Sequence, residues 1–280
     1  MAETFAGCDV VAHTHASLDI TDPAAVRQAV EQARPSAIIN CAAFNHVDDA
    51  ETRPADAFAV NAFAVRSLAR AAESVGATLV HYGSDFVFDG SASEPYPETA
   101  QPSPRSAYAL SKLLGEWFAL DAPRALVLRV ESLFGSTRTW SGRAGSVDSV
   151  LDALEQGRPA RVFLDRVVSP SYAEDVARAT RHLLETGAAP GLYHAVNSGY
   201  ATWCELAEEA ARLLGVPPRL ESVSVESVRF AAARPRFCAL ANEKLAAAGF
   251  PMPSWQDALR RWIAVRGLRT QQATIGRIHG

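Results

Sequence analysis

Short apolar runs alternate along this 280-residue chain with longer segments in which apolar residues recur every three or four positions. Such runs are typical of strands, and the longer segments are typical of amphipathic helices. The predicted strands lie at 9–12, 36–41, 78–82, 125–130, 161–164 and 192–196. The predicted helices lie at 23–33, 54–75, 147–156 and 173–185, with further helices around Tyr108 and after Thr202 and Ser254. This alternation predicts repeated βα units and therefore an α/β fold with a doubly wound parallel sheet.

Local signals mark the ends of several elements. Asp22, followed by a proline, is a helix N-cap, and Gly76 is a stop signal for the helix that precedes it. Thr202 and Glu205 have the spacing of a capping box. Four prolines between residues 89 and 106 exclude regular structure there, so this segment is predicted to be a loop that leads to the helix of Tyr108.

Composition and charge exclude several classes of protein. Hydrophobic residues make up 48% of the chain and charged residues 21%, and no apolar run approaches the ~18 residues of a membrane span. The formal net charge of -4 provides no basic field, so neither nucleic acid nor a membrane is expected as a partner. The first residues lack the basic and apolar regions of a signal peptide. Four widely spaced cysteines without a C-x-x-C pair are expected to be reduced and mostly buried, which fits a cytoplasmic location.

Tyr108 and Lys112 lie four residues apart in a predicted helix, so their side chains share one helix face. The pKa of a free phenol is about 10, and a neighbouring ammonium lowers it by stabilising the anion. A phenol in that position can give or take a proton at neutral pH. The same spacing also occurs on ordinary exposed helices, so the pair by itself does not distinguish a catalytic site from a solvated surface.

Ser84 follows a predicted strand at the edge where open parallel sheets bind their ligands. With the Tyr108-x-x-x-Lys112 pair and the strings around it, the chain resembles the extended short-chain dehydrogenases/reductases, and within them the dTDP-4-dehydrorhamnose reductase family. The matching strings are 18–22 (LDITD), 39–44 (INCAAF), 47–51 (VDDAE), 60–62 (VNA), 84–90 (SDFVFDG), 169–175 (SPSYAED) and 233–235 (ARP). They recur in the order of the family over residues 9–263, which is most of the chain.

The resemblance implies a Rossmann-type fold and a reductase that transfers hydride from NADPH or NADH to the keto group of a nucleotide-linked sugar. Tyr108 would be the general acid that protonates the carbonyl oxygen. Lys112 would lower the pKa of Tyr108 and hold the nicotinamide ribose. Ser84 would donate a hydrogen bond to the same carbonyl oxygen.

For the cofactor, the resemblance implies that Asp19 and Ile20 lie beside the adenine, and that Ala42 and Ala43 let the backbone approach the dinucleotide. Asn61 would connect the sheet to the active-site helix. Each of these residues also has a purely structural interpretation, as a loop aspartate, a core residue, tight packing or a buried amide. No metal is expected, because the two histidines near the N-terminus have no third ligand nearby.

Asp85, Phe86, Glu131 and Ser132 are the expected substrate-binding residues. Where the family usually reads Arg-Thr-Ser-Trp-Leu-Tyr-Gly, residues 129–135 read RVESLFG, which adds a carboxylate at Glu131 and removes the aromatic residue that packs on the sugar. Phe86 replaces a tyrosine of the family string. The resemblance therefore implies a nucleotide-linked sugar as substrate and leaves open whether it is dTDP-4-dehydrorhamnose itself.

The largest departure from the family is at the N-terminus. Such folds open with a strand, a G-x-x-G-x-x-G loop and a helix that holds the diphosphate, whereas Gly7 is the only glycine before Gly76. We interpret residues 1–6 as the end of the first helix, and we expect that about 20–30 residues of the fold are missing before it, the size of a strand and half a helix. A protein that has lost its dependence on the cofactor is the alternative.

The domain organisation follows from the same pattern. We expect a dinucleotide-binding domain from residues 1–130 and 169–196, a smaller substrate lobe from 131–168 and 197–263, and a disordered tail from 264–280. Two other functions remain open: a non-catalytic, dinucleotide-binding regulatory protein of the same fold, and a sugar-nucleotide epimerase or dehydratase, for which Asp85 is the only further acid/base candidate beside Ser84. The sequence chooses neither between NADH and NADPH nor between a monomer and a homodimer.

Overall fold

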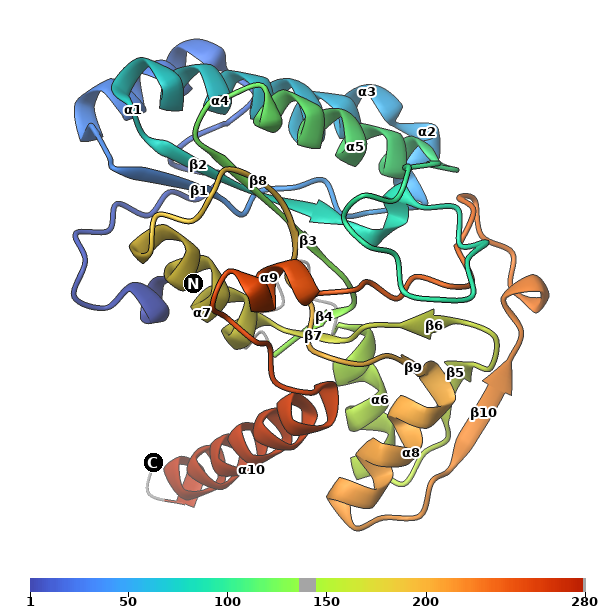
Figure 1. Cartoon of the computed structure of the whole chain (residues 1–280). Helices are drawn as coiled ribbons and strands as arrows, with labels where there is room; N and C mark the ends of the chain where they lie inside the picture. Colours follow the sequence, from blue (N-terminus) through green and yellow to red (C-terminus); the bar gives the residue numbers. More distant parts are fainter. Residues whose placement is uncertain (136–144, 279–280) are drawn as a thin grey trace.

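A four-stranded parallel sheet forms the centre of the larger part of the molecule (Figure 1). The computed structural model describes residues 1–135 and 145–278. The strands are adjacent in the order β1 (Ala37–Asn40), β2 (Thr78–Ser84), β3 (Ala125–Val130) and β8 (Gly191–His194). Each pair is parallel, and the β2–β3 register places Ser84 beside Val130. The predicted α/β fold is therefore confirmed.

Helices cover both faces of this sheet (Figure 1). The helices are α1 (Pro23–Ala33), α4 (Ala64–Val75) and α5 (Ala107–Leu120) on one face, with α7 (Ala173–Glu185) and α9 (Glu243–Ala247) on the other. Successive strand residues point to opposite faces, so Leu79 packs in the core under α1 and α4, and Val80 in the core under α7 and α9. All six residues of β3 are buried, as expected for a strand covered on both sides.

A second apolar core lies below the sheet in Figure 1. It is built by α6 (Ser146–Glu155), α8 (Trp203–Leu214), α10 (Trp255–Ile278) and the parallel pair β5 (Ala160–Phe163) and β10 (Leu220–Val223). Two short pairs connect it to the sheet: β4 (Leu133–Phe134) with β7 (Ser171–Tyr172), and β6 (Val167–Val168) with β9 (Ala201–Thr202). The Trp262 indole donates to Asp148 (2.8 Å) and thereby joins α10 to α6.

Local sequence signals behave as predicted at most element ends. Asp22 accepts from the backbone at the start of α1, Gly76 has φ 71° after α4, and Thr202 forms a capping box with Glu205. The predicted helix at 54–75 is present as α3 (Pro54–Phe58), a π-helical turn (Ala59–Phe63) and α4. The short helical turns are Ala2–Phe5, α2 (Asp49–Thr52), Asp85–Val87 and Val225–Ser227.

The predicted strand at 9–12 is wrong. These residues have no regular structure, and Val10 and Val11 are 48% and 63% exposed. The segment before them lies against α7, where the Arg181 guanidinium donates to the Thr4 carbonyl (2.7 Å). A strand forms only where a neighbouring strand pairs with its backbone groups. Residues 9–12 do not pair with β1, so they form no strand.

The predicted tail is also different from the structure. Where a disordered tail was expected from residue 264, α10 continues to Ile278. Arg266 donates to Asp152 (2.6 Å) and Glu155 (2.9 Å) on α6, which holds this part of α10 in place. Six of the twelve residues at 267–278 are good helix formers, and two are glycines, so helix propensity alone does not favour this continuation.

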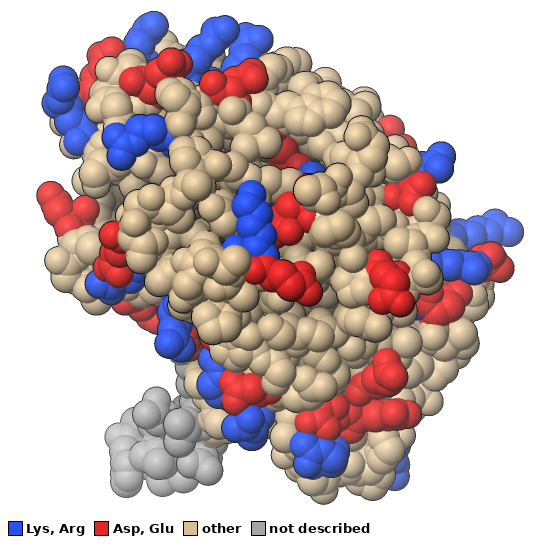
Figure 2. Space-filling view, viewed as in Figure 1, with Lys and Arg blue, Asp and Glu red and all other residues tan. Residues whose placement is uncertain are grey.

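Charges of both signs are interspersed over the face shown in Figure 2, without a continuous basic surface there. In residues 1–135 and 145–278, no helix combines the length and apolarity needed to cross a membrane. The cysteines are free, but the expectation that they are mostly buried is wrong: Cys8 and Cys41 are exposed, Cys204 is half-buried and Cys238 is buried.

Candidate active site

The carboxyl ends of β2 and β3 bring the predicted chemical groups together. Ser84 is the last residue of β2, and Glu131 follows β3 directly. Because the two strands are parallel and in register, their ends meet at one edge of the sheet. Helix α5 begins at the N-cap Ser106, whose side chain accepts from the Ala109 N–H, and carries the remaining two groups across this edge.

Tyr108 lies in the first turn of α5 and is 7% exposed. Its ring packs edge-on against Phe86 at 5.6 Å between centroids. Burial raises the pKa of Tyr108 above its ordinary value, and the nearby Asp85 charge adds to this, whereas a hydrogen bond with Ser84 opposes it. The phenol therefore keeps its proton at neutral pH and can act as a donor.

Lys112 lies on the same side of α5 as Tyr108, but its ammonium is directed to the backbone of β2 and not to the phenol. Its Nζ donates to the Tyr82 carbonyl at the end of β2 (2.6 Å). Burial lowers the pKa of Lys112 to about 8, and the charge of Glu116 counteracts part of this. The expected lowering of the Tyr108 pKa by Lys112 is not found, because a buried ammonium needs an acceptor and the Tyr82 carbonyl is the one within reach.

A buried ion pair fixes α5 on the sheet behind these groups. Arg129 on β3 donates to Glu116 on α5 (2.7 Å), and both side chains are at most 3% exposed. The backbone of α5 also lies close to that of the π-helical turn. A Cβ on Gly115 would lie 2.0 Å from the Asn61 carbonyl oxygen. Such a contact permits no side chain, so glycine is required at this position.

Asn61 reaches the active-site helix, as expected, but its other partner is the loop after β1 and not the sheet itself. Its Oδ1 accepts from the Phe44 N–H (2.8 Å), and its Nδ2 donates to the Phe44 carbonyl (3.1 Å) and to Ser111 Oγ (3.0 Å). The side chain thus links the loop after β1 to α5. It lies in the π-helical turn, where the altered backbone directs it inward.

Asp85 and Glu131 form a buried acidic pair beside Ser84. Ser84 Oγ donates to Asp85 (3.1 Å), and the Ser169 N–H donates to Glu131 (2.6 Å). Burial raises the pKa of Asp85 to about 6. Burial and the Asp85 charge raise the pKa of Glu131 well above its ordinary value, and Arg166 opposes both shifts. Both carboxyls therefore hold a proton to a higher pH than a free carboxyl does.

Two arginines that were not among the predicted site residues face Phe86, an expected substrate-binding residue. Phe86 is half-buried and is faced by the guanidinium groups of Arg166 (6.0 Å) and Arg234 (5.9 Å). Arg234 is held by Asp48 (2.7 Å). Ser132 is half-buried and has a φ of 42°, a conformation that costs energy for a residue other than glycine. Arg234 belongs to a string that carried the resemblance, which was the available signal; Arg166 had none.

The residues predicted for the cofactor are more open. Asp19 is exposed and accepts from Thr21, and Ile20 packs at the margin of the core under α1. Ala42 is exposed and Ala43 half-buried, just beyond β1. In the described part of the chain β1 pairs only with β2, so its outer edge is free.

The positions of these residues show which part of a nicotinamide dinucleotide the site fits. Tyr108, Lys112 and Ser84 at the ends of β2 and α5 fit the nicotinamide and its ribose, since they offer two donors and a charge in a buried place. At the diphosphate position the described residues offer no glycine loop, and Gly7 follows a turn that packs against α7. The fit is therefore good at the reacting end of the cofactor only.

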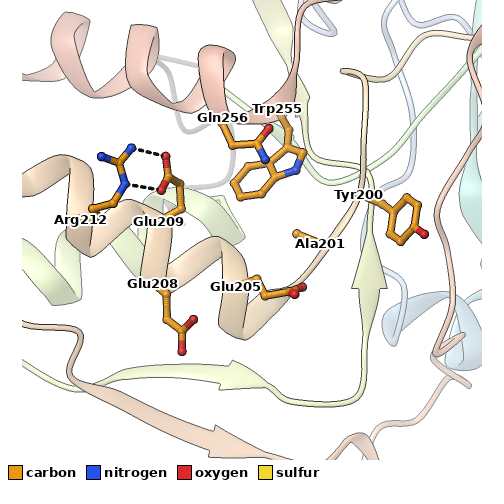
Figure 3. Close-up of a pocket in the computed structure, with 8 residues that line it drawn as sticks. All are labelled: Tyr200, Ala201, Glu205, Glu208, Glu209, Arg212, Trp255 and Gln256. Atoms are coloured by element: carbon orange, nitrogen blue, oxygen red, sulfur yellow. Dashed lines mark hydrogen bonds and ion pairs between the residues drawn. The ribbon is translucent and has the colours of Figure 1, made fainter.

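A separate pocket lies on α8 and does not include the predicted residues (Figure 3). Its wall carries Glu205, Glu208 and Glu209, the last of which is paired with Arg212 (2.6 Å). Trp255 of α10 closes one side. The pocket is open and acidic, which does not suit a phosphorylated ligand.

Comparison with known proteins relates most of this chain to reductases of dTDP-linked sugars. Residues 2–267 match the family described as RmlD substrate binding domain. The chain is 39% identical over 261 residues to a probable dTDP-4,6-dihydroxy-2-methyloxan-3-one 4-ketoreductase of Streptomyces antibioticus, with 90% of this chain and 85% of that protein covered. It is 37% identical over 261 residues to the dTDP-4-dehydrorhamnose reductase of Streptomyces griseus, with 90% and 84% covered.

The fold agrees with solved structures of such reductases. The dTDP-4-dehydrorhamnose reductase of Bacillus anthracis in complex with NADP superposes with a TM-score of 0.85 at 32% identity, over 91% of this chain and 90% of that one. The corresponding reductase of Clostridium acetobutylicum gives a TM-score of 0.86 at 29% identity, over 94% and 92%.

Proposed function

The chain belongs to the RmlD substrate binding domain family, and on this basis we propose that it reduces the 4-keto group of a dTDP-linked deoxysugar with a nicotinamide cofactor. The observation that carries the proposal is the buried constellation of Ser84, Tyr108 and Lys112 at one edge of a parallel sheet. A proton donor and a second hydroxyl placed together at this edge are the groups that carbonyl reduction requires.

The residues of the chain have separate tasks in this reaction. When bound, the dihydronicotinamide supplies the hydride. Tyr108 protonates the oxygen of the keto group as negative charge develops on it, and Ser84 donates a hydrogen bond to the same oxygen. Lys112, fixed by the Tyr82 carbonyl, holds its positive charge near the end of β2, where it attracts the cofactor ribose.

For the sugar nucleotide, we expect Phe86 to form one wall of the sugar site, with Ser132 at its margin. Arg166 and Arg234 face this ring and offer positive charge to the diphosphate of the substrate. Asp85 and Glu131 are too buried to form a broad contact with the sugar, so we expect them to support the residues that line its site.

NADPH is the reductant we propose first, because a similar reductase from Bacillus anthracis is described with NADP. Asp19, Ile20, Ala42 and Ala43 remain the proposed cofactor contacts on the adenine and diphosphate side. Free Cys8 and Cys41 on the surface suit a reducing compartment, so we also propose a cytoplasmic location.

We further propose that two copies pair through α4 and α5. Leu110, Trp117 and Leu120 on α5, and Phe63 just before α4, are between 38% and 53% exposed. Phe63 contacts Phe118 of α5, and we take these exposed side chains together as the pairing surface. Sedimentation should give a dimer, and Trp117→Glu should give a monomer; a monomeric parent protein would disprove the pairing.

The function is tested with purified protein, NADPH and a panel of dTDP-linked 4-keto sugars. We expect NADPH oxidation with at least one of them and a product whose new hydroxyl is on the carbon that carried the keto group. Product analysis by NMR identifies the sugar that is preferred. Cofactor binding without product from any sugar in the panel would favour the non-catalytic alternative.

A further inference from the structure

Three buried side chains that can bind a metal ion lie together beside Ser84. One carboxylate oxygen of Asp85, one of Glu131 and the Cys238 sulfur are all within 4.8 Å of one another. The three side chains are at most 4% exposed. No metal was predicted from the sequence, where these residues are far apart, so the cluster is a product of the fold.

The backbone determines where the three groups lie. Strands β2 and β3 are parallel and in register, so Asp85 and Glu131, which follow them directly, emerge side by side. The Cys238 N–H donates to the carbonyl of Val167 in β6 (2.9 Å), which holds the cysteine in place. Ligands on such fixed backbone positions are what a preformed binding site requires.

Each of the three groups accepts a hydrogen bond from a neighbour. The donors are Ser84 Oγ to Asp85 (3.1 Å), the Ser169 N–H to Glu131 Oε2 (2.6 Å) and the Arg166 guanidinium to Cys238 Sγ (3.7 Å). Outer donors of this kind orient the ligands in metal sites. They also leave other lone pairs of the same side chains for an ion.

One of these ligand groups has an oxygen without any partner. Glu131 Oε1 is buried and makes no hydrogen bond in the part of the chain that the structure describes. A buried carboxylate oxygen without a donor or a cation is costly. This unpartnered atom is the observation that points to a ligand.

The Cys238 thiol has a bond that an ion would replace. It donates to the Pro235 carbonyl (3.5 Å), and the same carbonyl accepts from Arg166 Nε (3.1 Å). Loss of the thiol proton therefore leaves the Pro235 carbonyl with a donor. The resulting thiolate keeps its bond from the second nitrogen of Arg166.

We propose that Asp85, Glu131 and Cys238 bind a divalent cation of the Zn²⁺ type. A thiolate favours Zn²⁺ over Mg²⁺ and Ca²⁺, which take oxygen ligands, and carboxylates also bind Zn²⁺. Three protein ligands leave the fourth position of the ion to a water molecule. The inference goes beyond the proposed reductase function and does not depend on it.

Protons and charges balance in this binding step. Only deprotonated groups bind the ion, so the Cys238 S–H bond breaks, and its proton leaves to solvent with any proton on the carboxyls. A metal–sulfur bond and two metal–oxygen bonds form, without oxidation or reduction. Arg166 balances one of the three negative charges, and the ion balances the other two.

Zn²⁺ binding is measured on the untagged full-length protein without cofactor or sugar, by dialysis against Zn²⁺ and elemental analysis. We expect one ion per chain and a higher midpoint of thermal unfolding, because the ion binds the folded chain only. With Co²⁺ as the probe, the protein should show a thiolate-to-cobalt charge-transfer band. No bound ion, or bound Co²⁺ without this band, would overturn the inference.

Two variants identify the ligands. Cys238→Ser should abolish the cobalt band, and Glu131→Gln should weaken Zn²⁺ binding by more than the about 10–100-fold that loss of an outer partner costs. Cys204→Ser is the matched control, because the Cys204 thiol contacts the Phe163 carbonyl and Ser222 instead of the cluster. Zn²⁺ binding that is unchanged in Cys238→Ser, or lost equally in Cys204→Ser, would show an adventitious ion only.

Circular dichroism checks that the variants are folded. If Cys238→Ser does not fold, the cobalt spectrum of the parent protein and the affinity of Glu131→Gln decide the question. The outcome is separate from that for the reductase. A bound ion in a protein that reduces no sugar leaves the metal site standing, whereas turnover in a protein that binds no Zn²⁺ disproves the site and leaves the reductase function intact.

Discussion

The carboxyl edge of the sheet has two ends that are built in different ways. At β2 and β3, Ser84, Asp85, Tyr108 and Glu131 are all at most 7% exposed. Ser84 donates to Asp85, and Glu131 accepts from the Ser169 N–H. At β1, the outer edge of the strand has no partner among the described residues, and Ala42 is exposed. The groups for chemistry are thus fixed by the chain itself, whereas the predicted contacts to the adenine and diphosphate depend on a surface that is open.

The difference shows what each end requires from the sequence. The end at β2 and β3 depends on a few buried polar residues with definite partners, and short sequence motifs are enough to specify such residues. The cofactor end depends on backbone approach, on glycine and on a paired strand, and these come from long-range neighbours. Substitutions at the first end should therefore have large effects, and those near the second end small ones.

The largest effect is expected for Tyr108→Phe. Without the phenolic proton, turnover should fall by about 10³-fold or more, within the range usual for general acid catalysis. Affinity for NADPH should stay near that of the parent protein, because the ring and its contact with Phe86 remain. Tyr200→Phe is the matched control, since Tyr200 is exposed. Unchanged turnover in Tyr108→Phe would remove this residue from the mechanism.

The next largest effect is expected on stability, for Glu116→Gln. This change leaves the buried Arg129 guanidinium without its counter-charge, which typically costs about 3–5 kcal/mol of the free energy of unfolding. Denaturant unfolding measures it. In the control Glu185→Gln the broken pair with Arg181 is exposed, so the loss should be below about 1 kcal/mol. Equal losses in the two variants would show that the buried pair does not anchor α5.

The smallest effect is expected for Val11→Ser, in the segment that passes the open end. Val11 is 63% exposed, so the free energy of unfolding should change by about 0.5 kcal/mol or less. In contrast, Leu128→Ala in the fully buried β3 should cost about 2–5 kcal/mol. A loss of that size in Val11→Ser would mean that residues 9–12 are packed in solution and that the two ends are more alike than the structure indicates.

Local signals explain how much of the fold could be predicted from the sequence. Asp22, Gly76 and Thr202 act on neighbouring backbone groups only, so the ends of α1, α4 and α8 follow from a few residues. The 9–12 segment has the composition of a strand, but whether it pairs depends on which surface it reaches. It reaches no strand, and the turn before it lies against α7.

The same distinction explains the site. Ser84, Tyr108 and Lys112 could be found because their strings lie in a recognisable order. The acceptor for Lys112 could not be predicted, because Tyr82 is thirty residues away and accepts through its backbone carbonyl, which carries no sequence signature. Arg166 was missed for a similar reason, because only the folded chain brings it to Phe86 and to the two carboxyls.

The most direct test of the account is hydride transfer with NADPH that carries deuterium at the transferring position. With an accepted dTDP-linked 4-keto sugar, the product should carry deuterium on the carbon that held the keto group, and Tyr108→Phe should form almost none of this product. Mass spectrometry and NMR of the sugar measure both. Bound NADPH with an unlabelled, unreduced sugar would contradict the central claim that this chain is a working reductase.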